Sequence, residues 1–278
     1  MTVFWLNGEL RNRDEAVISV LDHGLTVGDG VFETLLVRDG APFALTRHVD
    51  RLFRSAAGMG LTMPSQELIR KAVEDVVTAA GDEAQRARLR VTVTSGAGPL
   101  GSERGDEPPT LIVTLTAAKA WGDSTTIATV PWTRNEKSAV VGVKTTSYAE
   151  NAVALAHAHS RGASEAVVAN TQGQLCEGTG SNVFVVVDGV VHTPSLATGC
   201  LAGITRELVL EWGPGVAEHC ESELPYDVLF TADEIFITSS TRDVHPVTRV
   251  DDRDVAVGPV TQLVAQEFAR RMAQGVDP

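Results

Sequence analysis

The sequence predicts a mixed α+β protein that is rich in hairpins and lacks a regular strand–helix–strand alternation. Short runs of apolar and β-branched residues are joined by turn-forming pairs such as Asp39-Gly40 and Asp188-Gly189, which is typical of β-hairpins. Other segments repeat their apolar residues at helical spacing and end in glycine. With 278 residues, the chain is long enough to bury one large core or two ordinary ones.

The first half is expected to combine strands with two amphipathic helices. Thr46 is predicted to cap the first helix and Gly60 to end it. Pro64 and Ser65 are residues that commonly open a helix, and they precede the second one. In order, we predict strands at residues 3–6, 31–37 and 42–45, helices at 47–60 and from 64 onward, and strands at 88–94 and 110–116.

The second half continues this mixture. We predict strands at residues 126–132, 166–169, 175–176, 183–187, 190–193 and 234–238, and helices at 148–161, 204–212 and 260–272. Between the halves, periodicity lapses at residues 117–125, where Gly122-Asp123-Ser124 breaks regular structure. The chain is therefore predicted to form a small domain at residues 1–118, a linker at 119–125 and a larger domain at 126–278.

Charge and composition argue against several classes of function. A net charge of −13 and a pI of 4.9 disfavour a nucleic-acid groove and an anionic membrane surface. No apolar run approaches the roughly 20 residues of a membrane span, and the N-terminal stretch does not resemble a signal peptide. The three cysteines are odd in number and widely spaced, which suggests reduced thiols in a cytoplasmic protein.

Two patterns that could indicate ligands are better explained as local structure. Residues 96–101, GAGPLG, match G-x-G-x-x-G after a predicted strand, but Pro99 and the following residues prevent the helix that a dinucleotide site needs. We interpret this stretch as a glycine-rich loop with the character of a substrate lid. His157 and His159 are two residues apart in a predicted helix and point to different faces, so no metal site is predicted.

Lys144 is the lysine with the clearest chemical promise. The chain has four lysines, and only Lys144 ends an apolar run and precedes a predicted helix. Apolar surroundings disfavour the charged form of a lysine and lower its pKa, which Schiff-base chemistry requires. Taken alone, however, the pattern is better explained by a lysine whose stem snorkels to solvent from a strand end.

Three other stretches carry groups suited to the same chemistry. Glu177 lies among small residues in EGTGSN, Gly203-Ile204-Thr205 opens a helix whose N–H groups suit a phosphate, and residues 239–241 place three hydroxyls after a strand. Each stretch also has an ordinary explanation as turn or cap chemistry. Together with a lysine they describe a pyridoxal phosphate site, in which the carboxylate keeps the pyridine nitrogen protonated and the hydroxyl-bearing stretches hold the phosphate.

With these motifs in place, the sequence resembles the fold-type IV pyridoxal-phosphate enzymes. This family comprises branched-chain, D-amino-acid and (R)-amine aminotransferases and 4-amino-4-deoxychorismate lyases. The resemblance covers nearly the whole chain, from NGEL near the start to the final helix. It implies that Lys144 of GVKTTSYAEN is the Schiff-base lysine, that Glu177 of CEGTGSNVF is the pyridine-nitrogen acid, and that Arg51 of HVDRL binds the cofactor phosphate.

The same resemblance assigns further contacts and the architecture. Tyr148 resembles the aromatic residue that contacts the phenolic oxygen of the cofactor, and Glu33 matches a family acid near the active site. The remaining implied cofactor contacts are Gly203, Ile204, Thr205, Ser240 and Thr241. The implied fold has a small N-terminal α/β-sandwich domain and a larger C-terminal pseudo-barrel domain, with the cofactor in the cleft between them and a homodimer as the assembly.

The reaction itself stays open between related chemistries. TSSTRDVHPV resembles the loop of D-amino-acid aminotransferases, so we expect an amino group to pass from a D-amino acid or (R)-amine to a keto acid. The alternative is 4-amino-4-deoxychorismate lyase, which forms 4-aminobenzoate and pyruvate, because WTRNEK and KTTSYAEN resemble lyase sequences about as well. A branched-chain L-amino-acid aminotransferase is the third candidate.

The pocket for the substrate carboxylate departs from both aminotransferase patterns. D-specific enzymes place a tyrosine where this chain has Phe32, and branched-chain enzymes place an arginine where it has Leu36. The arginine and histidine that D-specific enzymes carry in their version of the GAGPLG loop are also absent. A buried carboxylate still needs a cation. The sequence offers Arg38, Arg104, Arg134 and Arg242 as candidates.

Overall fold

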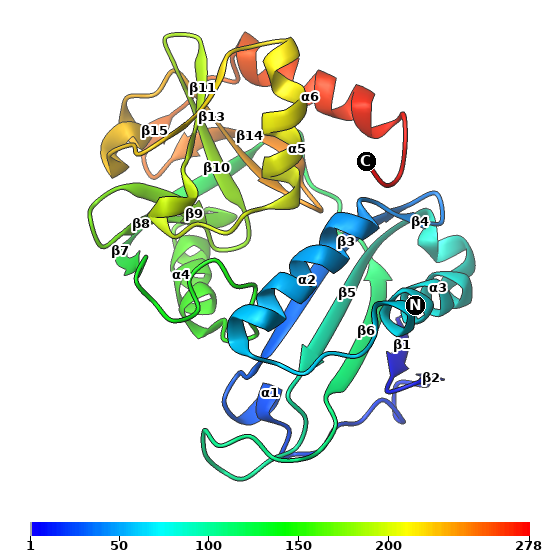
Figure 1. Cartoon of the computed structure of the whole chain (residues 1–278). Coiled ribbons are helices and arrows are strands. Elements are labelled where there is room, and N and C mark those ends of the chain that lie inside the picture. The colour runs from blue at the N-terminus through cyan, green and yellow to red at the C-terminus, as the bar shows by residue number, and fades with distance from the viewer. Residues whose placement is uncertain (1) are drawn as a thin grey trace. The chain divides into compact units, whose positions relative to one another are not determined.

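The structure, a computed structural model, describes residues 2–278 and divides into two compact units. Of the described residues, the first unit contains 2–119, 143–148 and 276–278, and the second contains 120–142 and 149–275. The predicted α+β class is confirmed, because each unit combines a sheet with helices (Figure 1). The division is not linear: residues 143–148, which include Lys144, pack with the first unit, whereas a single boundary near residue 119 assigns them to the second.

The first unit is built on a six-stranded antiparallel sheet in the order β2-β1-β6-β5-β3-β4. Its strands are β1 (Val3–Leu6), β2 (Glu9–Arg11), β3 (Gly30–Arg38), β4 (Ala41–Pro42), β5 (Arg86–Thr94) and β6 (Thr110–Ala117). Its helices are α1 (His23–Thr26), α2 (Leu45–Met59) and α3 (Gln66–Ala80), with the 3₁₀ turn η1 (Gly81–Gln85). Figure 1 shows α2 and α3 lying along the sheet.

Alternation along β3 separates the two faces of this sheet. Val31, Leu35 and Val37 join residues of α2 and α3 in one hydrophobic core. Because successive strand residues point to opposite faces, Phe32 and Leu36 lie on the other face. The core face therefore also carries Glu33, whose burial beneath α2 is a central feature of the site described below.

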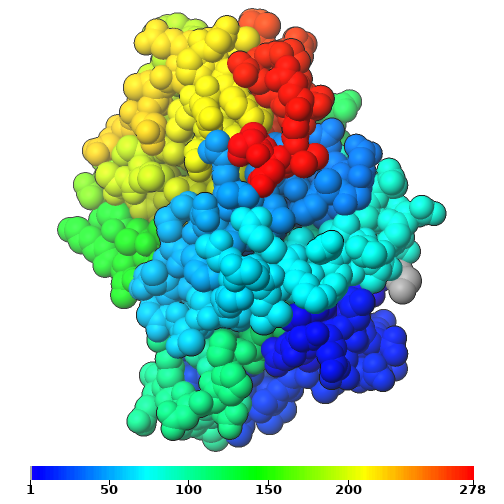
Figure 2. Space-filling model, turned by 45° about the vertical axis from the view of Figure 1, so that its right-hand side comes forward, coloured from blue at the N-terminus to red at the C-terminus, as the bar shows by residue number. Residues whose placement is uncertain are grey.

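The predicted cap of α2 is wrong. The helix begins at Leu45 after Ala44, which has a positive φ of 54° and no side-chain cap. The backbone N–H and the hydroxyl of Thr46 instead donate to the carboxylate of Asp277, at 2.9 and 2.6 Å. In Figure 2 the last residues, in red, lie against the blue start of this helix. A residue distant in the sequence thus supplies the oxygen that a local cap usually provides.

The second unit contains a nine-stranded sheet in the order β12-β11-β10-β13-β14-β7-β8-β9, with β15 paired to β14. Its strands are β7 (Thr125–Arg134), β8 (Glu165–Asn170), β9 (Leu175–Gly178), β10 (Asn182–Val187), β11 (Val190–Pro194), β12 (His219–Ser222), β13 (Glu234–Ser239), β14 (Asp243–Val250) and β15 (Arg253–Asp254). Its helices are α4 (Ala149–Ser160), α5 (Ile204–Trp212) and α6 (Pro259–Met272), with 3₁₀ turns at Leu196–Thr198, Gly213–Gly215 and Tyr226–Phe230. The β7–β8 pair is parallel and α4 is its crossover helix.

Strand β14 is the largest element that the sequence did not predict. It lies between β13 and β7 in the sheet, although it contains Pro246, a residue that argues against a central strand. Pairing with β7 begins only at Val247, so Pro246 is paired on the β13 side alone. Within residues 2–278, no helix is long and apolar enough to cross a membrane.

Candidate functional site

In the first unit, the segment around Lys144 lies along the start of β3. The backbone carbonyl of Lys144 accepts from the N–H of Phe32 at 3.0 Å, and its own N–H donates to the hydroxyl of Ser55 on α2 at 3.2 Å. Thr146 N–H donates to the carbonyl of Gly30 at 2.8 Å, and Thr145 forms an isolated bridge with Val31. These bonds fix the lysine backbone against both the sheet and α2.

Two of the predicted site residues form the aromatic surroundings of the Lys144 amine. Lys144 Nζ lies 4.6 Å from the ring centre of Phe32 and 6.0 Å from that of Tyr148. The two rings meet edge to face, with centres 5.1 Å apart and an interplanar angle of 77°. Such ring faces attract a cation.

Arg90 on β5 is a site residue that the sequence reasoning missed. Its guanidinium carbon lies 3.7 Å above the centre of the Phe32 ring, so it shares that ring with Lys144, and its Nε donates to the hydroxyl of Thr92 at 3.0 Å. Burial lowers the pKa of Arg90, the nearby Tyr148 opposes that shift, and Arg88 adds to it. Across residues 2–278, no carboxylate forms an ion pair with Arg90.

A signal for Arg90 was present in the sequence. In RARLRVTV, arginines occupy every second position at 86, 88 and 90, while the intervening residues 87, 89 and 91 are buried in the core. Strand alternation places the arginines together on the face of the sheet that carries Phe32. Only the register of β5 against β3, which pairs Phe32 with Thr92 and Thr34 with Arg90, brings one of them to the lysine.

Arg51 lies in a buried charge cluster on the opposite face of β3. Its Nε and Nη2 each donate to one carboxylate oxygen of Glu33 at 2.7 Å, and His48 Nδ1 lies 2.6 Å from the same carboxylate. Burial alone raises the pKa of Glu33, but Arg51 and His48 outweigh it and hold that pKa far below the usual range. Burial lowers the pKa of His48, against the opposing charge of Glu33. The two-point contact fixes the orientation of Arg51.

Arg38 and Arg104, two of the candidate cations, lie elsewhere in this unit. Arg38 ends β3, six residues from Phe32, which corresponds to about 20 Å along a strand. Arg104 donates to both carboxylate oxygens of Asp29, at 2.7 and 2.8 Å, and to two carbonyls at the end of α2. Arg104 therefore anchors the glycine-rich loop between β5 and β6 to α2.

In the second unit, Glu177 at the end of β9 is held by a cation and by a backbone donor. Arg134 Nε lies 3.2 Å from Glu177 Oε1, and the N–H of Leu201 donates to Glu177 Oε2 at 2.9 Å. Arg134 also donates to Asn151 at 3.1 Å and lies 3.6 Å from the carboxylate of Glu150. Arg134, named from the sequence as a candidate for the substrate carboxylate, is thus a partner of Glu177.

The start of α5 has the features of a phosphate site. Gly203 is the N-cap and gives the helix no side-chain cap, while Ile204 and Thr205 follow as the first two helical residues. A Cβ added to Gly203 would lie 1.9 Å from Asn182 Oδ1, so a larger residue there would force the buried Asn182 side chain to move. N–H groups at the start of a helix attract an anion through the helix dipole.

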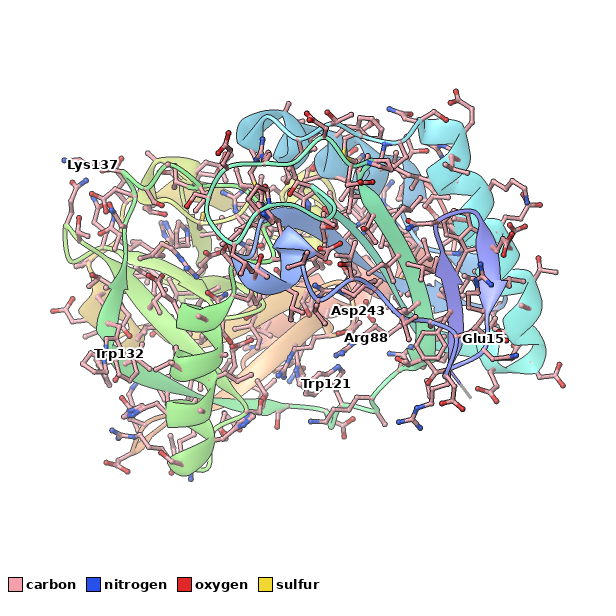
Figure 3. All side chains as sticks on the ribbon, turned by 90° about the horizontal axis from the view of Figure 1, so that it is seen from below. Glu15, Arg88, Trp121, Trp132, Lys137 and Asp243 are labelled. Carbon is pink, nitrogen blue, oxygen red and sulfur yellow. The ribbon has the colours of Figure 1, made fainter. Side chains whose placement is uncertain are left out.

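Ser240 and Thr241 form the turn between β13 and β14. The adjacent Arg242 lies 3.6 Å above the ring of Trp121 and donates to the carbonyl and the hydroxyl of Ser164 at 3.1 and 3.3 Å. Figure 3 shows Trp121 close to the start of β14, which is marked by Asp243. Burial lowers the pKa of Arg242. These contacts hold the Arg242 side chain on its own unit.

The donor groups of each unit suit pyridoxal phosphate, the cofactor that the sequence resemblance implies. The first unit offers an amine beside two aromatic rings and an oriented arginine, Arg51. The second offers an acceptor for a pyridinium proton, Glu177, and an uncapped helix start at Gly203. In residues 2–278, no group of three or more His, Cys, Asp and Glu side chains could hold a metal ion.

Comparisons with known proteins agree with this chemistry. The family model described as amino-transferase class IV matches residues 30–250. A putative branched-chain-amino-acid aminotransferase of Methanocaldococcus jannaschii is 33% identical over 275 residues, covering 95% of this chain and 94% of that protein. A D-alanine aminotransferase of Listeria monocytogenes is 29% identical over 286 residues, covering 97% and 96%.

A solved structure gives the same fold with a cofactor derivative bound. It is a branched-chain amino acid aminotransferase from T.th., complexed with N-(5'-phosphopyridoxyl)-L-glutamate, and it superimposes with a TM-score of 0.89 at 28% identity. The match covers 98% of this chain and 94% of that one.

Proposed function

Because the chain belongs to the class IV aminotransferases, which depend on pyridoxal phosphate, we propose that its amino donor is a carboxylate-bearing D-amino acid. A keto acid is the acceptor. An (R)-amine without an acid group, the other donor that the sequence suggested, is a poorer fit to the first unit. The distinction depends on Arg90.

Arg90 carries the proposal because it is a cation beside the reactive lysine. It lies 3.7 Å above the Phe32 ring, whose centre is 4.6 Å from Lys144 Nζ. A carboxylate leaving water for this apolar setting needs a charged partner. The planar guanidinium of arginine matches a carboxylate with two parallel hydrogen bonds. A donor without a carboxylate would leave this cation without that partner.

The remaining roles follow from the chemistry of each group. When bound, pyridoxal phosphate supplies an electron sink for the substrate carbon that loses its proton. Lys144 would hold the cofactor covalently, and its Nζ, once the donor amine has displaced it from the cofactor, would move the substrate proton. Glu177 keeps the proton on the pyridine nitrogen, and Arg51 with the first turn of α5 binds the phosphate.

The stereochemistry of the amino donor is a separate part of the proposal. The hydroxyl-rich loop at residues 239–241 resembles that of D-amino-acid enzymes, and D-alanine aminotransferases are among the relatives. A branched-chain L-amino acid is the second candidate, since a relative 33% identical to this chain carries that name.

The experiment is a half-reaction without acceptor, followed by the absorbance of the lysine-bound cofactor. We expect D-alanine to remove that absorbance rapidly and (R)-1-phenylethylamine to remove it only slowly, while L-leucine leaves it in place. Reaction with L-leucine alone would support the branched-chain alternative. Formation of 4-aminobenzoate from aminodeoxychorismate without an amino acceptor would identify the lyase and overturn the proposal.

The proposed assembly is a homodimer in which the second copy of the chain covers residues 17–27. This short stretch of the first unit exposes several apolar side chains, including Val17 at 69%, Val20 at 78% and Leu25 at 63%. Exposed apolar residues gathered in this way mark interaction surfaces. Sedimentation should show a dimer that Val20→Glu with Leu25→Glu dissociates, whereas Leu68→Glu on α3 leaves it intact. A wild-type monomer would contradict the assembly.

We also propose a cytoplasmic location. Cys176, Cys200 and Cys220 are free thiols in the structure. Thiols persist in reducing compartments. Labelling with a thiol reagent after unfolding of protein isolated from cells should modify all three, and an intramolecular disulfide would count against this location.

A further inference from the structure

Glu165 is a buried carboxylate that the proposed chemistry does not use. It begins β8 and is 4% exposed. Its Oε1 accepts from the N–H of Thr179 at 3.0 Å and from the Thr179 hydroxyl, and its Oε2 accepts from the Ser181 hydroxyl at 3.0 Å. The N–H of Ala166 also donates to Oε1, at 3.1 Å. Apart from this bond within β8, every donor belongs to the loop that follows Glu177.

The Glu165 carboxylate and this loop, residues 178–181, stabilise each other in their observed positions. Ion pairs described for residues 2–278 do not include Glu165. Burying a carboxylate is costly unless hydrogen bonds replace its water, so the loop donors make its burial possible. Space is equally restrictive: a Cβ on Gly178 would lie 2.3 Å from Ser181 Oγ and 3.2 Å from the Glu165 carboxyl carbon.

The same loop is connected to the partners of Glu177. The carbonyl of Thr179 accepts from the side-chain amide of Asn151 at 2.6 Å, and the Asn151 oxygen accepts from Arg134 at 3.1 Å. Arg134 is the cation that lies 3.2 Å from Glu177. A chain of direct contacts within the second unit therefore runs from Glu165 to Glu177.

We propose that Glu165 is a positioning residue for Glu177. By fixing Thr179 and Ser181, it sets the direction in which the Glu177 carboxylate points and keeps Arg134 in place beside it. The inference rests on the proposed role of Glu177 as the partner of the pyridine nitrogen. It assigns Glu165 no contact with substrate or cofactor.

The test compares Glu165→Gln with Glu234→Gln in the cofactor-loaded enzyme. Glu234 is a matched control, because it is also a buried carboxylate of the second unit, 5% exposed, that accepts backbone N–H groups. Its donors, however, are Val260 and Thr261 at the start of α6. A glutamine places an N–H₂ group where an oxygen accepted hydrogen bonds, and both variants should therefore melt at lower temperature than the wild type.

Only Glu165→Gln should change the affinity for the cofactor and the properties of the bound cofactor. We expect its dissociation constant for pyridoxal phosphate to rise about 10-fold to 100-fold, and kcat to fall similarly with little change in KM, because a small misplacement has effects of that size. The pH titration of the cofactor absorbance should also shift, because the charge on the pyridine nitrogen, which Glu177 stabilises, influences the pKa of the absorbing group. Glu234→Gln should keep the wild-type spectrum, titration and cofactor affinity.

Equal cofactor properties in both variants would overturn the proposal. Should Glu165→Gln not fold, Ser181→Ala removes a single donor and should shift the titration and the affinity in the same direction by a smaller amount. No shift there would also refute it. If instead the wild type fails to transaminate any amino acid, the proposed substrate is wrong. Cofactor affinity and titration would still report on Glu165.

Discussion

Replacing Arg90 by leucine tests the assignment of the substrate carboxylate. Leucine keeps an apolar side chain near the Phe32 ring, over which the guanidinium now lies at 3.7 Å, and removes only the charge and its donors. A hydrogen bond to a charged group contributes about 1.5–3 kcal/mol. Converted to rates, that range is roughly a 10-fold to 150-fold loss in kcat/KM.

The assay measures kcat/KM for the α-amino acid that reacts fastest and for an amine that lacks a carboxylate. Arg90→Leu should lower the first value by about 30-fold, near the middle of the expected range, and leave the second unchanged or higher. Arg90→Lys should fall between wild type and Arg90→Leu, since it keeps the charge but loses the two-point contact.

Arg88→Leu is the matched control for this prediction. Arg88 shares the strand and the face with Arg90 but is exposed and pairs in register with Leu36, farther from Lys144. Its removal should change kcat/KM for the amino acid by less than about 3-fold, the size expected for a surface substitution. If kcat/KM of the Arg90→Leu enzyme fell equally for both substrates, or for neither, the role of Arg90 in carboxylate binding would be refuted.

Three other substitutions test the cofactor site and the fold. Gly203→Ala places a Cβ 1.9 Å from Asn182 Oδ1 and should weaken pyridoxal phosphate binding in equilibrium dialysis; unchanged affinity would contradict a close-fitting helix start. Glu33→Gln leaves Arg51 without its carboxylate and should lower the free energy of unfolding by about 3–5 kcal/mol, as broken buried ion pairs do. Arg51 and His48 depress the pKa of Glu33 in the folded protein, although burial opposes them. The contribution of Glu33 to stability is therefore complete above pH 4.5, its ordinary pKa, and is lost as the pH falls toward the lowered pKa of the folded state. Denaturant titrations should show that acid-side loss in the wild type and not in the variant. Asp277→Ala removes the acceptor at the start of α2 and should cost about 1 kcal/mol in the same titration; no change would show that the C-terminal residues do not cap the helix.

The sequence by itself determined the α+β class, most of the strands and helices, and the family. These features depend on local information: hairpin pairs, helical spacing, and short motifs around Lys144, Glu177 and Gly203. Such signals can be recognised without knowledge of the fold because each is contained in a few adjacent residues. Reliance on local signals also explains why strand β14 was missed, because Pro246 argues locally against a central strand.

Only the tertiary structure decided which distant side chains meet. The register of β5 against β3 brings Arg90 to the ring beside Lys144, and the end of β7 places Arg134 beside Glu177, whereas the sequence offered four arginines without a means of ranking them. Long-range packing also moved residues 143–148 into the first unit. Charged side chains carry no local preference for a partner, so their roles emerge only when burial and sheet register fix the neighbours they have.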